Sequence, residues 1–268
     1  MAETVIRTEP RPGVALLTMN RPDRLNAMSY ELVRDLHEAL DEISVDRTTR
    51  VVVITGAGRG FCAGLDLVAG ASVPGTEDLG RHQATLAVQK HIASLVPKLR
   101  NLPQPVIAAI NGPAAGGGFA LSLASDVRIA GQSARFAVAF VRIGYSGCDI
   151  GVSWLLPRLI GAGRAWELML TGRIIDSDEA HRLGLLSAVV PDDELLDCAL
   201  AKAEEIARNS PFGVSMTKEV MWSQLEIPSL QAGIDLENRT QLLTGSTEDA
   251  REARAAFLEK RDPVFHNR

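Results

Sequence analysis

The sequence predicts an α/β domain followed by a wholly helical C-terminal region. Short apolar runs bounded by Gly, Pro or Asn recur along the chain before Pro191, and amphipathic segments with helical spacing separate them, whereas no such run follows Pro191. The 268 residues, 46% apolar and 23% charged, suffice for one large buried core. We place the boundary near residue 195, with the α/β core in 1–195 and the helical region in 196–268.

The first part of the chain alternates predicted strands and helices. Residues 14–19 are apolar or β-branched enough for a strand, and from Ser29 to Ile43 apolar side chains recur at helical spacing. Residues 67–85 lack a hydrophobic period and contain Gly and Pro, so we expect a loop over the active cleft, followed by a helix through residues 88–99. Two further runs predict buried strands, 51–54 and 106–110.

The same alternation continues to Pro191. Asp176 and Glu179 form a capping-box-like start for a helix, and Gly184 is placed to end it. The strands expected here are 127–130, 134–138 and 185–190, and the helices are 119–124, 155–160, 165–170 and 177–183.

Three consecutive glycines, Gly116 to Gly118, stand between the strand at 106–110 and the apolar helix at 119–124. Glycine has no Cβ, so a ligand can approach main-chain N–H groups that lack an acceptor within the helix, and the helix dipole adds a positive field there. The turn is therefore predicted to bind negative charge.

A second glycine-bearing turn follows the strand at 51–54. Gly56 and Gly58 fit the start of a dinucleotide-binding motif, but Phe61 occupies the place of its third small residue and no convincing helix follows. Two loops that each offer a free N–H favour a pocket for one developing oxyanion. Two ordinary glycine turns explain the spacing about equally well.

Six motifs in order along the chain resemble the crotonase superfamily of enoyl-CoA hydratases and isomerases. The resemblance implies a crotonase-like spiral of repeated strand-strand-helix units, a C-terminal helical trimerisation region, and a homotrimer or dimer of trimers. It also implies an acyl-CoA thioester as ligand, with coenzyme A entering as part of the substrate, so no separate cofactor is expected. No metal is expected either, because the chain has no Cys-x-x-Cys pair and His82 and His91 lack the i, i+4 spacing of a metal pair. The motifs are Asn20-Arg-Pro22 with Leu25-Asn-Ala27, Phe61-Cys-Ala-Gly-Leu-Asp66, Pro105-Val-Ile-Ala-Ala-Ile-Asn-Gly112, Ala115-Gly-Gly-Gly118, Leu156-Pro-Arg-Leu-Ile-Gly161 and Leu170-Thr-Gly172.

The resemblance assigns roles to particular positions. The backbone N–H groups of Leu65 and Gly117 correspond to an oxyanion hole for the thioester oxygen. Phe257 and Lys260 match positions near the CoA nucleotide of a neighbouring subunit. Asp66 is also expected to hold its own loop in place, because an Asp side chain readily accepts hydrogen bonds from nearby main-chain N–H groups. The other positions expected at the substrate site are Leu25, Asn26, Ala63, Asp66, Gly116, Ala120 and Phe140.

The two glutamates that serve hydration in this family are replaced here by Ala120 and Phe140. Loss of one general acid-base group typically costs roughly 10²–10⁴-fold in rate, so hydration is expected to be poor. Asp149 aligns, with a one-residue insertion, with an aspartate used by dienoyl-CoA isomerases and aroyl-CoA dehalogenases of the superfamily. In an apolar pocket its pKa would rise and it could move protons between carbons. Asp149 could equally cap the helix that follows it.

Composition limits the partners. A net charge of −5 without a Lys/Arg run argues against a nucleic-acid surface. No uncharged stretch is long enough to span a membrane, and no apolar signal segment follows Met1, so a cytoplasmic location is expected. The three cysteines, Cys62, Cys148 and Cys198, are widely spaced, which is typical of reduced thiols.

Two functions follow from these observations. The first is an enzyme of the enoyl-CoA hydratase/isomerase family that is isomerase-like or otherwise enolate-forming. The alternative is a catalytically silent acyl-CoA-binding protein, which the absence of both glutamates favours and the presence of Asp149 opposes.

Overall fold

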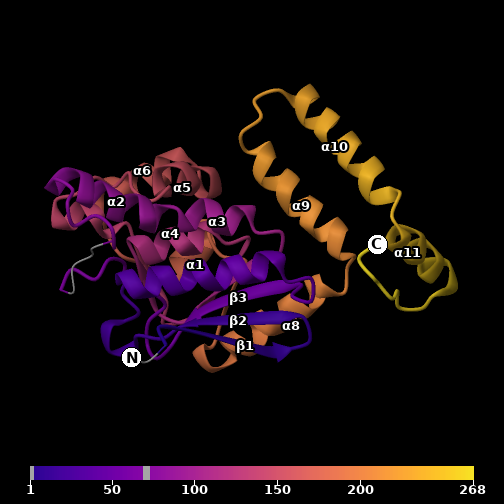
Figure 1. Ribbon diagram of the computed structural model, residues 1–268, viewed down its shortest axis with the longest axis horizontal. Helices are drawn as coiled ribbons and strands as arrows, with labels where there is room; N and C mark the ends of the chain where they lie inside the picture. The colour runs from indigo at the N-terminus through magenta and orange to yellow at the C-terminus, as the bar shows by residue number, and fades with distance from the viewer. Residues whose placement is uncertain (1–2, 69–72) are drawn as a thin grey trace.

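The computed structural model describes residues 3–68 and 73–268, which form a six-stranded sheet and a second sheet of three short strands, with helices around them (Figure 1). The larger sheet has the order β1-β2-β3-β4-β6-β9. Its first two strands are antiparallel, and all other neighbours are parallel. Its strands are β1 (Val5–Arg11), β2 (Val14–Met19), β3 (Val51–Gly56), β4 (Val106–Ile110), β6 (Val127–Gly131) and β9 (Ala188–Val190).

The chain passes repeatedly from the larger sheet to the smaller one and back through a helix. The smaller sheet has the order β5-β7-β8, comprising β5 (Pro113–Ala115), β7 (Arg135–Ala137) and β8 (Ile175–Asp176). One such passage runs from β4 to β5 and then through α4 (Gly117–Ala124) to β6. The last runs from β8 through α7 (Ser177–Arg182) to β9. This path is the predicted spiral of strand-strand-helix units.

Helices cover both faces of the larger sheet because alternate side chains of its buried strands point to opposite sides. Val52 and Ile54 belong to the same core cluster as the apolar face of α1 (Tyr30–Val45). Val51 and Val53 belong to the cluster formed with α8 (Leu195–Ala207). The first face also carries α2 (Arg81–Ala93), α3 (Leu95–Asn101), α5 (Val152–Ile160) and α6 (Ala162–Thr171).

The last three helices, α9 (Pro211–Gln224), α10 (Leu230–Gly245) and α11 (Glu248–Glu259), extend from the core as an arm (Figure 1). Strands end before residue 195, as predicted. However, α8 packs against β2, β3, β4 and β6, so it belongs to the core. The helices that leave the core therefore begin at Pro211 rather than at residue 196.

Most predicted elements are present, with local differences. The predicted strand at 185–190 is reduced to β9, because the Leu185 N–H donates to the Ala180 carbonyl oxygen at the end of α7. Helix α2 begins at Arg81, inside the stretch predicted as a loop, and residues 69–72 of that stretch lie outside the described residues. Strands β1, β5 and β8 were not predicted. Among the helices that the structure describes, none is long and apolar enough to cross a membrane.

Candidate active site

The two glycine turns predicted from the sequence lie against each other. Cys62 of the first turn and Ala114 of β5 form a parallel bridge. A Cβ atom placed on Gly64 would lie 2.8 Å from the Ala115 carbonyl oxygen and 3.4 Å from the Gly117 nitrogen. With a φ of +90° and this close approach, the Gly64 position accepts no larger residue without strain. The backbones of the two turns thus adjoin at the start of α4.

The N–H groups of Leu65 and Gly117 have no acceptor within the part of the chain that the structure describes. Gly117 is the first residue of α4, so its N–H has no acceptor within the helix. In the other turn, the Met28 N–H donates to the Gly64 carbonyl oxygen, and the Met28 carbonyl oxygen accepts from the Asp66 N–H. Neither hydrogen bond uses the N–H of Leu65, which lies between Gly64 and Asp66. Within residues 3–68 and 73–268, no group accepts a hydrogen bond from the Leu65 N–H. Two donors on adjoining loops are the arrangement that an oxyanion hole requires.

Asn26, expected at the substrate site, is fully buried and holds the first turn in place. Its Nδ2 donates to the carbonyl oxygens of Gly60, at 2.7 Å, and Ala57, at 3.0 Å. Its Oδ1 accepts from the Arg21 N–H at 2.8 Å. Leu25, with a left-handed φ of 50°, packs beside Gly60. The polar atoms of Asn26 are therefore occupied within the protein, and the residue positions the loop that carries Leu65.

Asp66 has a similar structural place. It is 4% exposed, accepts from the Val68 N–H at 3.1 Å, and pairs with Arg21 Nη2 at 2.8 Å. Arg21 also donates to the Ala27 carbonyl oxygen, so it joins two segments of the site. The main-chain contact expected for Asp66 is present. Arg21 itself was not predicted as a site residue, although it lies in the quoted Asn20-Arg-Pro22 motif.

Apolar side chains surround the triple-glycine turn. A Cβ atom on Gly116 would lie 3.3 Å from Cε1 of the Phe140 ring, and one on Gly117 would lie 3.5 Å from Cδ1 of Ile150. Ala120, three residues into α4 from Gly117, is fully buried. A methyl group and an aromatic ring therefore stand at the two positions where the resemblance implies carboxylates in hydratases.

Asp149 directly precedes Ile150, whose side chain lies beside the triple-glycine turn. The carboxylate Oδ1 accepts from the Ile150 N–H at 2.8 Å and from Gln89 Nε2. Burial raises the pKa of Asp149 above its usual range, against the lowering effect of these two hydrogen bonds. The alternative role as a cap is wrong for the side chain, because α5 begins after Gly151 and none of the described side chains caps it. Sequence reasoning missed Gln89, since nothing in the local sequence of α2 marks it.

The remaining predicted positions lie apart or are backbone supports. Ala63 donates its N–H to the Leu25 carbonyl oxygen at 3.0 Å. Phe257, 82% exposed, lies on α11, and Lys260 ends that helix with a left-handed φ of 54°. Helix α11 lies at the far end of the arm from α4 (Figure 1). One chain alone therefore does not bring these two residues to the glycine turns.

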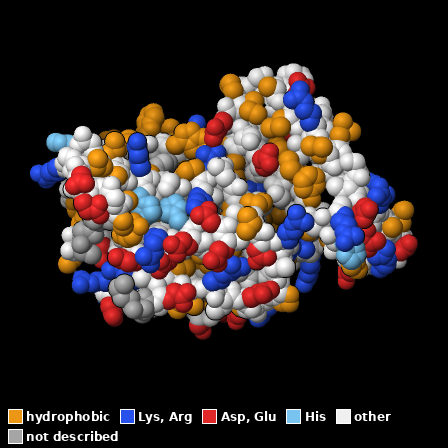
Figure 2. Space-filling model, viewed as in Figure 1, with side chains coloured by type: hydrophobic (Ala, Val, Ile, Leu, Met, Phe, Trp, Pro, Cys, Tyr) orange, Lys and Arg blue, Asp and Glu red, His pale blue; other side chains and the backbone are white. Residues whose placement is uncertain are grey.

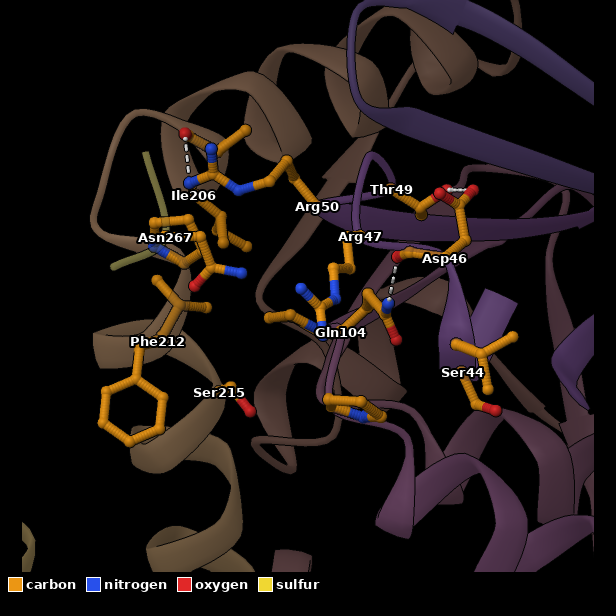
Figure 3. Close-up of a pocket in the computed structure, with 16 residues that line it drawn as sticks. Ser44, Asp46, Arg47, Thr49, Arg50, Gln104, Ile206, Phe212, Ser215 and Asn267 are labelled. Carbon is orange, nitrogen blue, oxygen red and sulfur yellow. Dashed lines mark hydrogen bonds between the residues drawn. The ribbon is translucent and has the colours of Figure 1, made fainter. Parts of the chain in front are cut away.

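A separate cavity of about 400 Å³ lies where the arm joins the core. Figure 3 shows Arg47, Arg50, Gln104 and Asn267 around it, with Phe212 on the side of α9. Arg50 Nη2 donates to the Ala207 carbonyl oxygen at 2.9 Å, which ties the edge of β3 to the end of α8. The predicted site residues lie elsewhere in the described chain, so this cavity is distinct from the glycine-turn site.

Comparison with known proteins supports the resemblance. The model of the enoyl-CoA hydratase/isomerase family matches residues 9–268. A probable enoyl-CoA hydratase of Mycobacterium tuberculosis is 45% identical over 265 residues, covering 97% of this chain and 92% of that one. The 1,2-epoxyphenylacetyl-CoA isomerase of Escherichia coli is 41% identical over 255 residues, covering 94% and 95%. The crystal structure of a probable enoyl-CoA hydratase/isomerase from Mycobacterium abscessus superposes with a TM-score of 0.93 at 42% identity, covering 99% of each chain.

Proposed function

The chain belongs to the enoyl-CoA hydratase/isomerase family and has its crotonase fold, and we propose that it is an isomerase-like, enolate-forming enzyme that acts on acyl-CoA thioesters with Asp149 as its acid-base group. One observation carries the proposal. The half-buried Asp149 carboxylate has a raised pKa and precedes Ile150, whose side chain lies beside Gly117, whereas Ala120 and Phe140 stand at the positions that the resemblance gives to both hydratase glutamates.

In the proposed reaction the thioester oxygen accepts hydrogen bonds from the Leu65 and Gly117 N–H groups. Asp149 takes a proton from a substrate carbon, and the electron pair of the broken C–H bond moves into the thioester carbonyl to give an enolate. Each oxyanion donor is worth roughly 2.7–4 kcal/mol at the transition state. Asp149 then delivers a proton to another carbon of the conjugated enolate. Because the carboxyl is only half-buried, its proton exchanges with solvent between the two transfers, so deuterium enters the product in D₂O. The product is an isomer, and no water or cofactor is consumed.

The apolar side chains of Ala120 and Phe140 make hydration of the substrate unfavourable. Activation of water needs a group that accepts its proton, and neither the Ala120 methyl group nor the Phe140 ring can do so. A single carboxylate suffices for proton transfer between two carbons of one bound substrate. The 41% identical relative named as an isomerase is consistent with this proposal.

The arm supports a further part of the proposal, a homotrimer or dimer of trimers. Large apolar side chains are exposed on it, and Figure 2 shows hydrophobic side chains gathered on its surface. A lone subunit would leave this surface in water, whereas a closed symmetric assembly would bury it. In such an assembly Phe257 and Lys260 would approach the CoA site of a neighbour. Among these exposed residues are Leu230, Ile234, Leu242, Leu243, Phe257 and Leu258.

The test is exchange of substrate protons with solvent in D₂O, measured for a panel of saturated and unsaturated acyl-CoAs. Wild type should exchange the α-proton, and Asp149→Asn should be slower by roughly 10²–10⁴-fold, the usual contribution of an acid-base group. Binding of acyl-CoA by calorimetry without any exchange or isomerisation in wild type would instead favour the silent binding protein. Failure to bind any thioester would reject both functions.

A further inference from the structure

The two oxygens of the Asp149 carboxylate are inequivalent, because hydrogen bonds from its neighbours reach only one of them. We propose that Gln89 is a positioning residue: together with the Ile150 N–H it occupies Oδ1 of Asp149 and leaves Oδ2 as the atom that carries the proton. This inference rests on the proposed function, because it assigns a part in that reaction to a residue outside the glycine turns.

The hydrogen bonds around Asp149 support this assignment. Gln89 Nε2 and the Ile150 N–H, at 2.8 Å, both donate to Oδ1. In the part of the chain that the structure describes, no donor reaches Oδ2. Two donors stabilise negative charge on Oδ1 and prevent rotation of the group. Oδ2 keeps its lone pairs, so it is the oxygen able to accept and return a proton.

The backbone at Ile150 is strained in a way that serves the same geometry. Ile150 has a φ of +46°, a left-handed conformation that is rare for a β-branched residue, and Gly151 follows with a φ of +79°. The turn directs the Ile150 N–H onto the carboxylate that precedes it. It also brings the Ile150 side chain within 3.5 Å of a Cβ position on Gly117. The strained backbone at Ile150 therefore connects Asp149, the proposed acid-base group, to the triple-glycine turn.

Helix α2 is held so that Gln89 keeps its place. His91, two residues further along α2, stacks on Tyr30 with ring centroids 5.2 Å apart and lies 5.1 Å from His37, both on α1. Ile92 is buried in the core. Residues two apart on a helix point to nearly opposite sides, so anchoring by His91 leaves Gln89 directed toward Asp149.

Among the described residues, no charged side chain competes with Gln89 for this role. The influences on the Asp149 pKa are burial, which raises it, and the hydrogen bonds from Ile150 and Gln89, which lower it. Of the two donors, Gln89 is the one that acts through its side chain. Its amide therefore controls both the orientation of the carboxylate and the stability of its anion.

The test uses two substitutions at Gln89 and one control on the same helix. Gln89→Met keeps the length and removes the donor, and Gln89→Glu replaces the donor with a second carboxylate. Gln83→Met makes the same chemical change at an exposed position whose side chain lies over Gly80. For Gln89→Met we expect kcat for proton exchange to fall about tenfold with KM little changed, as for loss of a hydrogen bond to a charged group.

The pH dependence separates positioning from general damage. Because the anion loses a stabilising bond, the acidic limb of the kcat/KM profile should move to higher pH in Gln89→Met and further in Gln89→Glu, and stay in place in Gln83→Met. Carbon-13 NMR titration of the aspartate carboxyls in the full chain without substrate should show the same upward shift of the Asp149 pKa. An unchanged Asp149 pKa in Gln89→Met would overturn the positioning role even in an active enzyme. A wild type that exchanges no proton would overturn the proposed function instead.

Discussion

Lys218 and Asp126 form a buried ion pair that fastens the helical arm to the core. Lys218 Nζ lies 2.9 Å from Asp126 Oδ2, and the two side chains are 3% and 6% exposed. Lys218 also donates to the carbonyl oxygens of Leu99 and Gln104, and Trp222 Nε1 donates to Asp126 Oδ1. Lys218 and Trp222 belong to α9, whereas Asp126 lies between α4 and β6. The pair therefore joins the arm to the sheet that carries the site.

Lys218→Met should destabilise the protein by about 3–5 kcal/mol, because it leaves the Asp126 carboxylate buried without its charge partner. Urea unfolding measures this. Lys202→Met is the matched control, since Lys202 pairs with Glu205 on the surface and such pairs contribute about 0–1 kcal/mol. Equal midpoints for the two variants would show that the buried pair does not hold the arm. The double variant Lys218→Met with Asp126→Asn should recover part of the loss.

Local sequence signals predicted the elements whose pattern is complete within one segment. Helix α1 begins after Ser29, whose Oγ accepts from the Leu32 N–H, and β2 and β4 have the predicted bounds. Asp176 caps α7 by accepting from the Glu179 N–H. The two glycine turns were also visible, because glycines that cluster after a buried strand mark a close backbone approach within one short segment.

Features that depend on distant segments were not visible. Strand β8 has two residues and exists only because Ile175 pairs with Phe136 of β7. The end of the strands at Pro191 suggested a boundary, yet the apolar face of α8 covers the sheet. Gln89 and Asp149 are 60 positions apart, so neither sequence neighbourhood announces their contact.

Gly64→Ala should damage both the fold and the site. The new methyl group would lie 2.8 Å from the Ala115 carbonyl oxygen at a residue with φ of +90°, so the first turn must move away from Gly117. We expect a loss of stability of about 1–3 kcal/mol and a lower kcat/KM as the donors separate. Gly163→Ala is the control, because it lies in α6 with open space around it and should be neutral or stabilising. If kcat/KM is unchanged in Gly64→Ala, the two turns do not act as one oxyanion hole.

Asp149→Asn should be more stable than wild type at neutral pH. The pKa of Asp149 is higher in the folded state than in the unfolded chain. Between these two values the folded state binds more protons, so stability falls as pH rises through this window. Asparagine does not titrate, so its Tm should exceed that of wild type at about pH 8 and match it near about pH 3, where Asp149 is protonated in both states. A Tm difference independent of pH would contradict the raised pKa.

Leu242→Glu should weaken the assembly. Leu242 is 77% exposed on α10, and a carboxylate there cannot be buried against a neighbouring subunit without a partner. Light scattering should show a trimer or hexamer for wild type and smaller species for the variant. Gln231→Glu adds the same charge to the same helix without removing apolar surface, and it should assemble normally. Wild type that scatters as a monomer would reject the trimer. Truncation at residue 195 is a poorer test, because it removes α8 from the core.

The prediction that one rate measurement can most directly contradict concerns hydration of crotonyl-CoA. Wild type should hydrate it far below the roughly 10 s⁻¹ typical of enzymes while still exchanging substrate protons. The cause is that the Phe140 ring, beside Gly116, stands where hydration needs an acid-base group, and the ring cannot transfer a proton.

Phe140→Glu should therefore raise the hydration rate, because it places a carboxylate at one of the two positions that the resemblance gives to hydratase glutamates. Adding Ala120→Glu, which fills the second position in the buried α4, should raise the rate further. Phe140→Gln has the same shape but cannot transfer a proton, so it should remain as slow as wild type. Steady-state loss of the enoyl absorbance measures all four proteins. Wild-type hydration at ordinary enzymatic rates would show that another residue activates water, and equal rates for Phe140→Glu and Phe140→Gln would show that the missing acid is not what prevents hydration.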